Sequence, residues 1–290
     1  MIERARLSVI VLTRDEELNL PACLASLGDW VENIVVVDSG STDRTVEIAR
    51  EHGAQIVEHA FESHGQQWAW AVENVAPESE WILGLDADQI VSDILRASML
   101  ELFADAPRLE RHSGFYLNRR QIFRGRWIRY GGYYPKFLLK LFRRTDVRFD
   151  PADLMDHHFH VTGATGRLLG DLHERNHKED QISFWLMKHV RYAELLAAEE
   201  LLRRRGDIPV TEPALTGHPD QRTAWLKRRW YSLPRYWRPT IYFLYRYFIR
   251  FGFLDGREGF VFHVLQGFWL RLIVDVNLQE LERTNDRRSD

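Results

Sequence analysis

The sequence predicts an α/β protein with a mostly parallel sheet, flanking helices, a mixed-strand extension and a helical C-terminal region. Between residues 7 and 104, strands rich in Val and Ile alternate with helical segments, which is typical of βαβ units. Between residues 114 and 170 the strands become shorter and Gly-rich turns separate them. From residue 178 to 205 the apolar residues recur with the 3.6-residue period of a helix.

The first part of the chain contains four predicted strands joined by three predicted helices. The strands lie at residues 7–13, 33–38, 55–59 and 81–86, and the helices at 17–27, 44–52 and 66–75. Near-continuous apolar strands of this kind are expected in a sheet that helices cover on both faces. The stretches GFYLNRR, RYGGYYP and FLLKLFRR then predict the mixed extension, and Gly206 ends the helix at 178–205. We expect a first domain over residues 1–210 and a helical region over 211–290.

Composition limits the class of protein. The 290 residues are 45% hydrophobic with a net charge of −3, so the chain can bury a full core and is not intrinsically disordered. The single cysteine, Cys23, excludes an internal disulfide framework and a cysteine zinc cluster, and it fits a reducing compartment. The N-terminal apolar stretch is short and lacks a cleavage site, so we interpret it as a strand and not as a signal peptide.

Polar residues follow three of the predicted strands. The sequences TRDE, DSGSTD and DAD begin at Thr13, Asp38 and Asp86, each at the end of an apolar run. An open α/β sheet binds its ligand at the carboxyl ends of its strands. These polar groups are therefore expected to converge on one edge of the sheet.

The DAD sequence is a candidate metal site. Two carboxylates at i and i+2 repel each other unless a cation neutralises them, and oxygen ligands suit Mg²⁺ or Mn²⁺ that also binds phosphate oxygens. The alternative for Asp86 and Asp88 is a solvated turn that caps a helix. Their position at a strand end, on the same edge as two other polar loops, favours the metal site.

The loop VVVDSGSTDRT is a candidate nucleoside site. Asp38 ends a strand, Gly40 permits a tight turn, and Asp43 is interpreted as a helix cap. An acceptor at the position of Asp38 can hydrogen-bond a base or a ribose. The loop lacks the glycine patterns of dinucleotide and Walker-type sites, which argues against both.

Taken together, these motifs resemble glycosyltransferase family 2, with the GT-A fold. The resemblance rests on SVIVLTRDEELNLPACLASL, IVVVDSGSTDRTVEIAREHGA, LGLDADQIVS, FRGRWIRYGGYYP, LKLFRR and GFLDGREGF. The chain is most similar to the bacterial branch that builds lipopolysaccharide core and related surface glycans. The resemblance implies a nucleotide-sugar donor, a divalent cation (Mn²⁺ or Mg²⁺) and inversion at the anomeric carbon.

The resemblance also implies roles for individual residues. Asp86 and Asp88 would hold the donor diphosphate through the metal, and Asp38 would contact the base. Asp15, Ala69 and Gln89 depart from residues that the family often has at these positions. The residues implied in nucleotide binding are Thr13, Arg14, Glu16, Asp38, Gln67 and Asp86.

The catalytic base is expected in the sequence DLMDHHFHVTG. Relatives commonly have an acid directly before a histidine here, and this chain has Asp156-His157-His158. Either Asp156 or His157 therefore acts as the base, with Asp156 preferred. A histidine metal site is disfavoured because His157, His158 and His160 would alternate between two faces of a strand.

Aromatic residues in GRWIRYGGYYPKF offer flat faces on which a sugar acceptor can stack, although core packing explains each of them equally well. The candidate acceptor residues are Trp127, Tyr133, Tyr134 and His158.

The C-terminal region is basic and aromatic. Residues 221–250 contain eight Lys and Arg residues without one Asp or Glu, and no apolar run reaches the ~18 residues of a spanning helix. Attachment to a membrane surface or to a second protomer is favoured. A helical appendage that packs on the core is the alternative. A surface that binds nucleic acid is a third interpretation, and the DAD sequence at the edge of the sheet does not support it.

These observations predict a metal-dependent, inverting glycosyltransferase at the inner face of the cytoplasmic membrane. Residues 1–210 would bind the nucleotide sugar, with a UDP-sugar favoured as the donor, and the acceptor would be a glycan or lipid-linked. A sugar-nucleotide pyrophosphorylase would need a Gly- and Lys-rich phosphate loop, which LTRDEELNLP is not. A catalytically inactive glycan-binding or scaffold protein is the non-enzymatic alternative.

Overall fold

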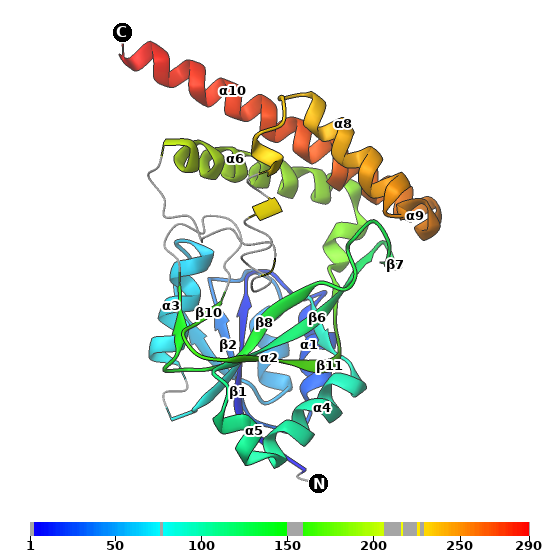
Figure 1. Cartoon of the computed structure of the whole chain (residues 1–290). Helices are drawn as coiled ribbons and strands as arrows, with labels where there is room; N and C mark the ends of the chain where they lie inside the picture. The colour runs from blue at the N-terminus through cyan, green and yellow to red at the C-terminus, as the bar shows by residue number, and fades with distance from the viewer. Residues whose placement is uncertain are drawn as a thin grey trace. The chain divides into compact units, whose positions relative to one another are not determined.

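The computed structural model describes residues 3–75, 78–149, 159–205, 216, 225–226 and 229–289, with side chains to residue 284 (Figure 1). The chain forms two compact units. The first contains Met1–Gly125 and Pro135–Lys178, and the second contains Arg126–Tyr134 and Glu179–Asp290. The domain boundary expected at residue 210 lies outside the described residues.

The first unit is built on one mixed sheet with the strand order β3-β2-β1-β4-β8-β6-β11-β5. β1 pairs in parallel with β2 and β4, and β2 with β3. β8 runs antiparallel to β4 and β6, β11 is parallel to β6, and β5 opposes β11. All strands of this path except β8 and β5 therefore point the same way, which confirms the predicted α/β class.

The strands of this sheet have the following bounds: β1 Ala5–Thr13, β2 Val31–Asp38, β3 Gln55–Glu58, β4 Trp81–Asp86, β5 Gln89–Val91, β6 Gly114–Phe123, β8 Phe137–Arg143 and β11 Thr165–Arg175. A separate two-stranded sheet contains β9 Val147–Arg148 and β10 His160–Val161.

Helices cover both faces of the sheet because its strands are apolar on both sides. Along β1, Val9 and Val11 belong to one buried cluster while Ile10 belongs to the other, as the two-residue period of a strand requires. The first cluster includes residues of α1, α2 and α4, and the second includes residues of α3. The helices of this unit are α1 Leu20–Leu27, α2 Thr45–Glu51, α3 His64–Asn74, α4 Asp93–Ala104 and α5 Ala106–Glu110.

Gly84 in the middle of β4 allows a close approach of aromatic rings. A Cβ atom at this position would lie 2.8 Å from Cζ of Phe159 and 3.1 Å from Cη2 of Trp68. The two rings meet edge to face, with centroids 4.9 Å apart. The absence of a side chain at Gly84 therefore lets Phe159 pack directly over the strand that ends at Asp86.

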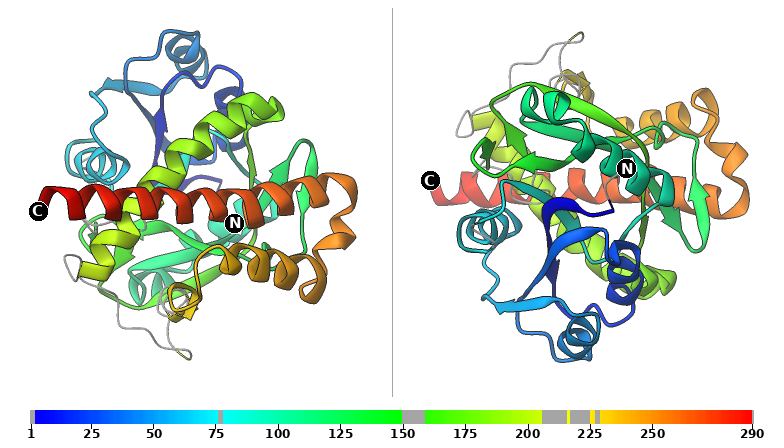
Figure 2. Two further views of the ribbon diagram at one scale, coloured as in Figure 1. Left: turned by 90° about the horizontal axis from the view of Figure 1, so that it is seen from above. Right: turned by 90° about the horizontal axis from the view of Figure 1, so that it is seen from below.

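The second unit consists mainly of helices. α6 contacts α10, and α8 contacts α10 and the π-helical segment η4; Figure 2 shows α6 crossing α10. Ala193 and Ala197 of α6 pack against Leu270, Val274 and Leu278. Its elements are β7 Arg126–Ile128, α6 Ile182–Arg205, α8 Trp237–Leu244, η2 Tyr245–Ile249, η3 Gly252–Asp255, α9 Gly256–Phe262, η4 His263–Trp269 and α10 Leu270–Ser289, while the 3-10 turn η1 His177–Asp180 leads into α6.

One helical stretch among the described residues, Gly252–Thr284, is long and apolar enough by length and composition to cross a membrane. Its best window has a mean hydropathy of 1.4, and 39% of that window is buried inside the protein. This differs from the sequence-based expectation, because the helix continues through the polar residues that interrupt the apolar runs. A core helix can meet the same criteria, and Leu270 and Val274 do belong to the core of this unit.

His189 makes the stability of the helical unit depend on pH. It is buried on α6, stacks on Trp185 with ring centroids 3.6 Å apart, and its Nδ1 lies 2.9 Å from the Trp185 carbonyl oxygen. Burial lowers its pKa from 6.5 to about 4. Between these values the unfolded chain binds a proton that the folded chain does not, so acidification favours unfolding.

We therefore expect the free energy of unfolding to fall by about 2 kcal/mol between pH 7 and pH 5 through this residue. His189→Phe should retain the stacking and remove this contribution, as measured by urea unfolding at both pH values. His52→Gln, at an exposed histidine of the first unit, is the matched control and should keep the wild-type pH dependence. An identical pH dependence in His189→Phe and wild type would contradict the assignment.

Candidate functional site

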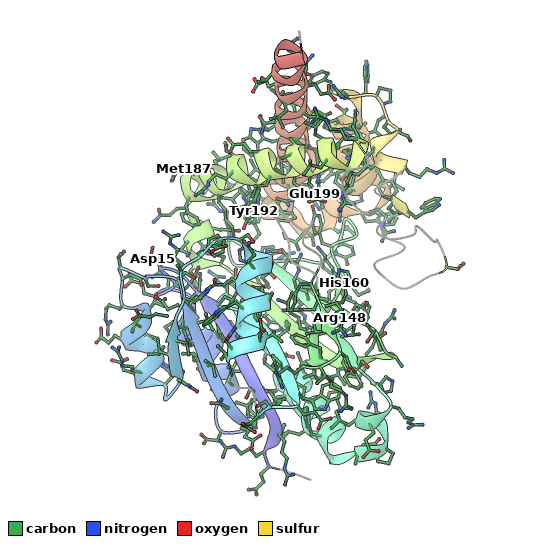
Figure 3. The ribbon with its side chains drawn as sticks, turned by 90° about the vertical axis from the view of Figure 1, so that its left-hand side faces the viewer. Asp15, Arg148, His160, Met187, Tyr192 and Glu199 are labelled. Atoms are coloured by element: carbon green, nitrogen blue, oxygen red, sulfur yellow. The ribbon has the colours of Figure 1, made fainter. Side chains whose placement is uncertain are left out.

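Three parallel strands bring the predicted polar loops to one edge of the sheet. In the pairing of β1 with its neighbours, Thr13 lies opposite Asp38 of β2, and Leu12 lies opposite Asp86 of β4. The last residues of these strands therefore meet side by side, as expected for the carboxyl ends of parallel strands. Figure 3 shows Asp15 in the loop that follows β1 at this edge.

Asp38 organises its own loop. It is only 2% exposed, and its carboxylate accepts hydrogen bonds from the backbone N–H groups of Gly40 (3.0 Å) and Ser41 (2.8 Å) and from Thr13 Oγ1 (2.9 Å). Charged acceptors with several donors make strong hydrogen bonds. The Asp38 carboxylate therefore fixes the loop that follows β2 as well as being the candidate contact for a base.

The loops after β1 and β2 are joined through Asp15. This residue has a left-handed backbone with φ of 54°, a conformation that Asp and Asn adopt more easily than most residues. Its N–H donates to Ser41 Oγ at 2.8 Å, and its Oδ1 accepts from the Thr42 N–H at 2.7 Å. Asp15 departs from the residue that the family often has at this position. Its carboxylate accepts a hydrogen bond from the backbone N–H of Thr42.

Glu16 is held by one residue nearby in the sequence and by one from the end of the first unit. Its carboxylate accepts from Lys178 Nζ at 2.5 Å and from Asn19 Nδ2 at 2.7 Å. Asn19 also bonds Asn176 and the His177 N–H. Lys178 is a functional candidate that the sequence reasoning placed only at the start of a helix, and its contact with Glu16 depends on tertiary structure.

Asp86 is paired with a buried lysine. Lys140 of β8 is 5% exposed, and its Nζ donates to Asp86 Oδ2 at 2.9 Å. The sequence reasoning missed this residue, although a lysine between apolar residues in FLLKLF is itself a signal, because a buried ammonium requires a counter-charge. The acidic edge also affects Cys23: burial raises the pKa of this thiol, and Asp88 and Asp86 raise it further.

Asp88 is anchored to the end of β11. Its carbonyl oxygen accepts from the Arg175 N–H at 2.9 Å, and its Oδ2 accepts from Asn176 Nδ2 at 3.2 Å. The side chains of Asp86 and Asp88 are both half-buried. The turn that carries the two carboxylates is thus held from β8 on one side and from β11 on the other.

Gln89 and Gln67 occupy structural positions beside this edge. Gln89 accepts from the Asp86 N–H at 3.2 Å and donates to Glu174 Oε2 at 3.0 Å, while Glu174 pairs with Arg119. Gln67 is buried and donates to Ser39 Oγ at 3.1 Å, next to Asp38. Gln89 thus bonds the backbone of Asp86, and Gln67 bonds the side chain of the residue that follows Asp38.

The other predicted site residues are Arg14, the aromatic acceptor candidates and the histidine-rich segment. Arg14 is exposed after β1. The aromatic acceptor candidates belong to the second unit: Tyr133 packs on Phe262 with centroids 4.8 Å apart, and Trp127 meets Tyr134 edge to face. Asp156, His157 and His158 lie outside the described residues, and His160 is in β10, opposite Arg148 (Figure 3).

Within the described ranges, no group of three or more His, Cys, Asp or Glu residues could hold a metal ion by itself. Asp86 and Asp88 supply two carboxylates from one turn. Mg²⁺ is usually held by one or two carboxylates together with water and substrate phosphates. The donor set therefore fits a cation that a diphosphate helps to bind.

Relatives match different lengths of the chain. It is 27% identical to the lipopolysaccharide core biosynthesis glycosyltransferase LpsC of Rhizobium meliloti, over 90% of this chain and 87% of that protein. A TPR repeat-containing protein of Synechococcus elongatus is 41% identical over 29% of the chain, and an uncharacterized glycosyltransferase of Rickettsia typhi is 26% identical over 41%. The matched segments span 21% and 40% of these two proteins.

Among solved structures, glucosyl-3-phosphoglycerate synthase of Mycobacterium tuberculosis is 18% identical with a TM-score of 0.45, covering 74% of this chain and 85% of that chain. The family model for glycosyl transferase family 2 matches residues 8–163. This segment contains β2, β4 and the part of β1 from Ser8 onward, and it covers more than half of the 290 residues. The protein therefore belongs to glycosyl transferase family 2.

Proposed function

We propose that the protein is an inverting glycosyltransferase that transfers a sugar from a nucleoside-diphosphate sugar, with uridine as the base, to a lipid-linked or glycan acceptor of a bacterial surface polysaccharide. The observation that carries the proposal is the pair Asp86 and Asp88 directly after β4, at the edge where Thr13 and Asp38 end β1 and β2. Membership of family 2 and the similarity to LpsC support it. The similarity to LpsC also supports a reaction in the cytoplasm.

Asp86 and Asp88 would hold the divalent cation. Lys140 Nζ donates to Asp86 Oδ2, and Asn176 Nδ2 donates to Asp88 Oδ2. An ionised carboxylate has about four lone-pair sites, so these bonds are compatible with a metal ligand role. Bound there, the cation would neutralise the charge that develops on the departing diphosphate. Lys140 orients Asp86, while Asn176 and the Arg175 N–H orient Asp88.

The loop after β2 would bind the nucleoside. Its backbone is fixed by Asp38 and, through Ser41 and Thr42, by Asp15. A loop that is ordered before binding loses less entropy when the nucleotide arrives. Two effects would lower the activation free energy of sugar transfer: the preorganised polar groups of this edge, and the placement of the donor carbon against the acceptor.

The proton of the acceptor hydroxyl would be removed by Asp156 or His157. We prefer Asp156, because a carboxylate in this segment matches the acid that the sequence resemblance implies. Attack by the deprotonated hydroxyl on the face opposite the leaving diphosphate forms the new glycosidic bond, breaks the bond to the diphosphate and inverts the anomeric carbon.

The Asp88 carboxylate tests the metal site. We expect Asp88→Asn to abolish sugar transfer and the Mn²⁺-dependent part of UDP binding in isothermal titration, because the amide cannot replace an anionic ligand. Asp93→Asn makes the same change of charge at an exposed residue five positions away and should leave both unchanged. Transfer by Asp88→Asn at the wild-type rate would exclude the proposed metal site.

Asp38 should contribute to both stability and nucleotide affinity. Asp38→Ala leaves buried donors without an acceptor, so we expect a loss of about 1–3 kcal/mol in the free energy of unfolding. We also expect UDP affinity to fall roughly ten- to a hundredfold. Asp29→Ala, at an exposed aspartate, is the control. If stability falls while the dissociation constant for UDP stays the same, Asp38 only supports its own loop.

The pH–rate profile identifies the base. If Asp156 is the base, His157→Gln should keep the ascending limb of kcat/KM at the pH of the wild type, whereas Asp156→Asn should lose transfer and retain UDP binding. Loss of a limb near the histidine pKa in His157→Gln would assign the role to His157. If the wild-type protein turns over none of the nucleotide sugars offered, the alternative of a catalytically inactive binding protein would be favoured.

A further inference from the structure

The helical unit exposes many large apolar side chains between residues 236 and 260. They come from α8, η2, η3 and α9, which Figure 1 shows in orange at one end of this unit. We call this surface the apolar face. Its members are Tyr236, Trp237, Ile241, Leu244, Tyr245, Phe248, Ile249, Phe251, Phe253, Leu254 and Phe260.

Helical spacing places many of these residues on one side. Trp237, Ile241 and Leu244 are followed by Phe248 at intervals of three and four residues, which lie on the same side of a helix. Trp237 is 69% exposed, whereas its neighbour Arg238 is completely buried. Soluble monomers rarely expose apolar surface on this scale unless it binds a partner or a membrane.

A cavity of about 420 Å³ lies beside the apolar face, entirely within the second unit. It is lined by Arg129, Tyr130, Gly132, Tyr134, Ile249, Arg250 and Phe251. Its lining thus combines two arginines with aromatic and aliphatic side chains and contains no acid. Both arginines are exposed, and in the described part of the chain neither guanidinium lies within ion-pair distance of a carboxylate.

The nearest acid on the adjoining segment is already occupied. Asp255 is buried, and its two carboxylate oxygens accept from the backbone N–H groups of Arg129 and Tyr130, each at 3.0 Å. These bonds hold the loop that carries Arg129 against η3. Gly131 completes this attachment by donating its N–H to the Arg250 carbonyl oxygen at 2.9 Å. The two arginines are thus fixed relative to each other through their backbones.

Phe251 is in a conformation that stability alone does not explain. It has φ of 60° and is 56% exposed. A bulky residue in the left-handed region costs about 1–2 kcal/mol, which glycine would avoid, and an exposed ring contributes little to the core. Observed strain of this kind is a reason to look for a function. The ring forms part of the rim of the cavity.

We propose that Arg129 and Arg250 bind the phosphate headgroup of an anionic phospholipid while Phe251 and the apolar face enter the membrane interface. Guanidinium groups match the geometry of phosphate, and arginine beside Trp, Tyr and Phe suits the boundary between headgroups and acyl chains. This docking site combines residues of the Arg126–Tyr134 segment and of the C-terminal region, both in the second unit. The proposal does not depend on the proposed transfer reaction.

A second copy of the chain fits this surface less well. Between residues 229 and 275 the acids are Asp255, Glu258 and Asp275, and none of them is exposed. In an isologous contact each copy presents the same surface to the other. Its arginines would therefore face an interface without an exposed carboxylate, whereas an anionic bilayer supplies the missing charge.

Cosedimentation of the full-length chain with vesicles tests the proposal without donor or acceptor. We expect binding to phosphatidylglycerol-containing vesicles, weaker binding to pure phosphatidylcholine vesicles, and weaker binding at high salt. Arg129→Gln with Arg250→Gln should reduce the partition coefficient on anionic vesicles by more than about tenfold, because each cation contributes about 1 kcal/mol. Arg96→Gln, at an exposed arginine of the first unit, should retain wild-type binding.

Phe251→Gly separates a docking role from a structural one. It relieves the left-handed strain, so we expect the midpoint of thermal unfolding to stay the same or rise while vesicle binding falls. Equal binding of anionic vesicles by wild type and the double arginine variant would overturn the headgroup site. Absence of vesicle binding, with a dimer in sedimentation velocity that Phe251→Gly dissociates, would overturn the membrane proposal and identify a self-association surface.

Discussion

The parallel pairing of β1 with β2 and β4 is the constraint on which the candidate site depends. Because the strands share one direction and pair as Thr13 with Asp38 and Leu12 with Asp86, their polar ends meet at one edge. A one-residue shift of β1 would move its side chains from one buried cluster to the other and change the packing on both faces. The two buried clusters on either side of β1 therefore fix the positions of the aspartates.

The acids of this edge are matched by partners from distant parts of the chain. Lys140 pairs with Asp86, Lys178 with Glu16, and Arg119 with Glu174. Removing one member of a buried pair leaves an uncompensated charge and costs several kcal/mol. The mixed extension from β6 to β11 thus completes the sheet and also supplies Lys140 and Arg119 to these carboxylates, while Lys178 follows β11.

The helical unit uses charge in two different ways. Inside it, the buried Arg238 bonds Glu200 of α6 at 3.0 Å and Asp275 of α10 at 2.6 Å, so one guanidinium joins both helices. At its surface, Arg129 and Arg250 have no such carboxylate partners in the described residues. The first arrangement organises the helices around a satisfied charge, and the second leaves cations for an external anion.

The sequence by itself determined the α/β class, the convergence of the three polar loops and the family, because alternating apolar segments and residues at strand ends are local patterns. It also indicated a basic, aromatic C-terminal region, although not that Arg238 is buried while Arg250 is exposed. Only the tertiary structure decided that Lys140 reaches Asp86, that Asp38 binds its own loop, and that Tyr133 and Tyr134 belong to the helical unit. The contact of Lys140 with Asp86 and that of Tyr133 with Phe262 join residues far apart in the chain. Their geometry follows from the packing of whole elements, which local periodicity does not encode.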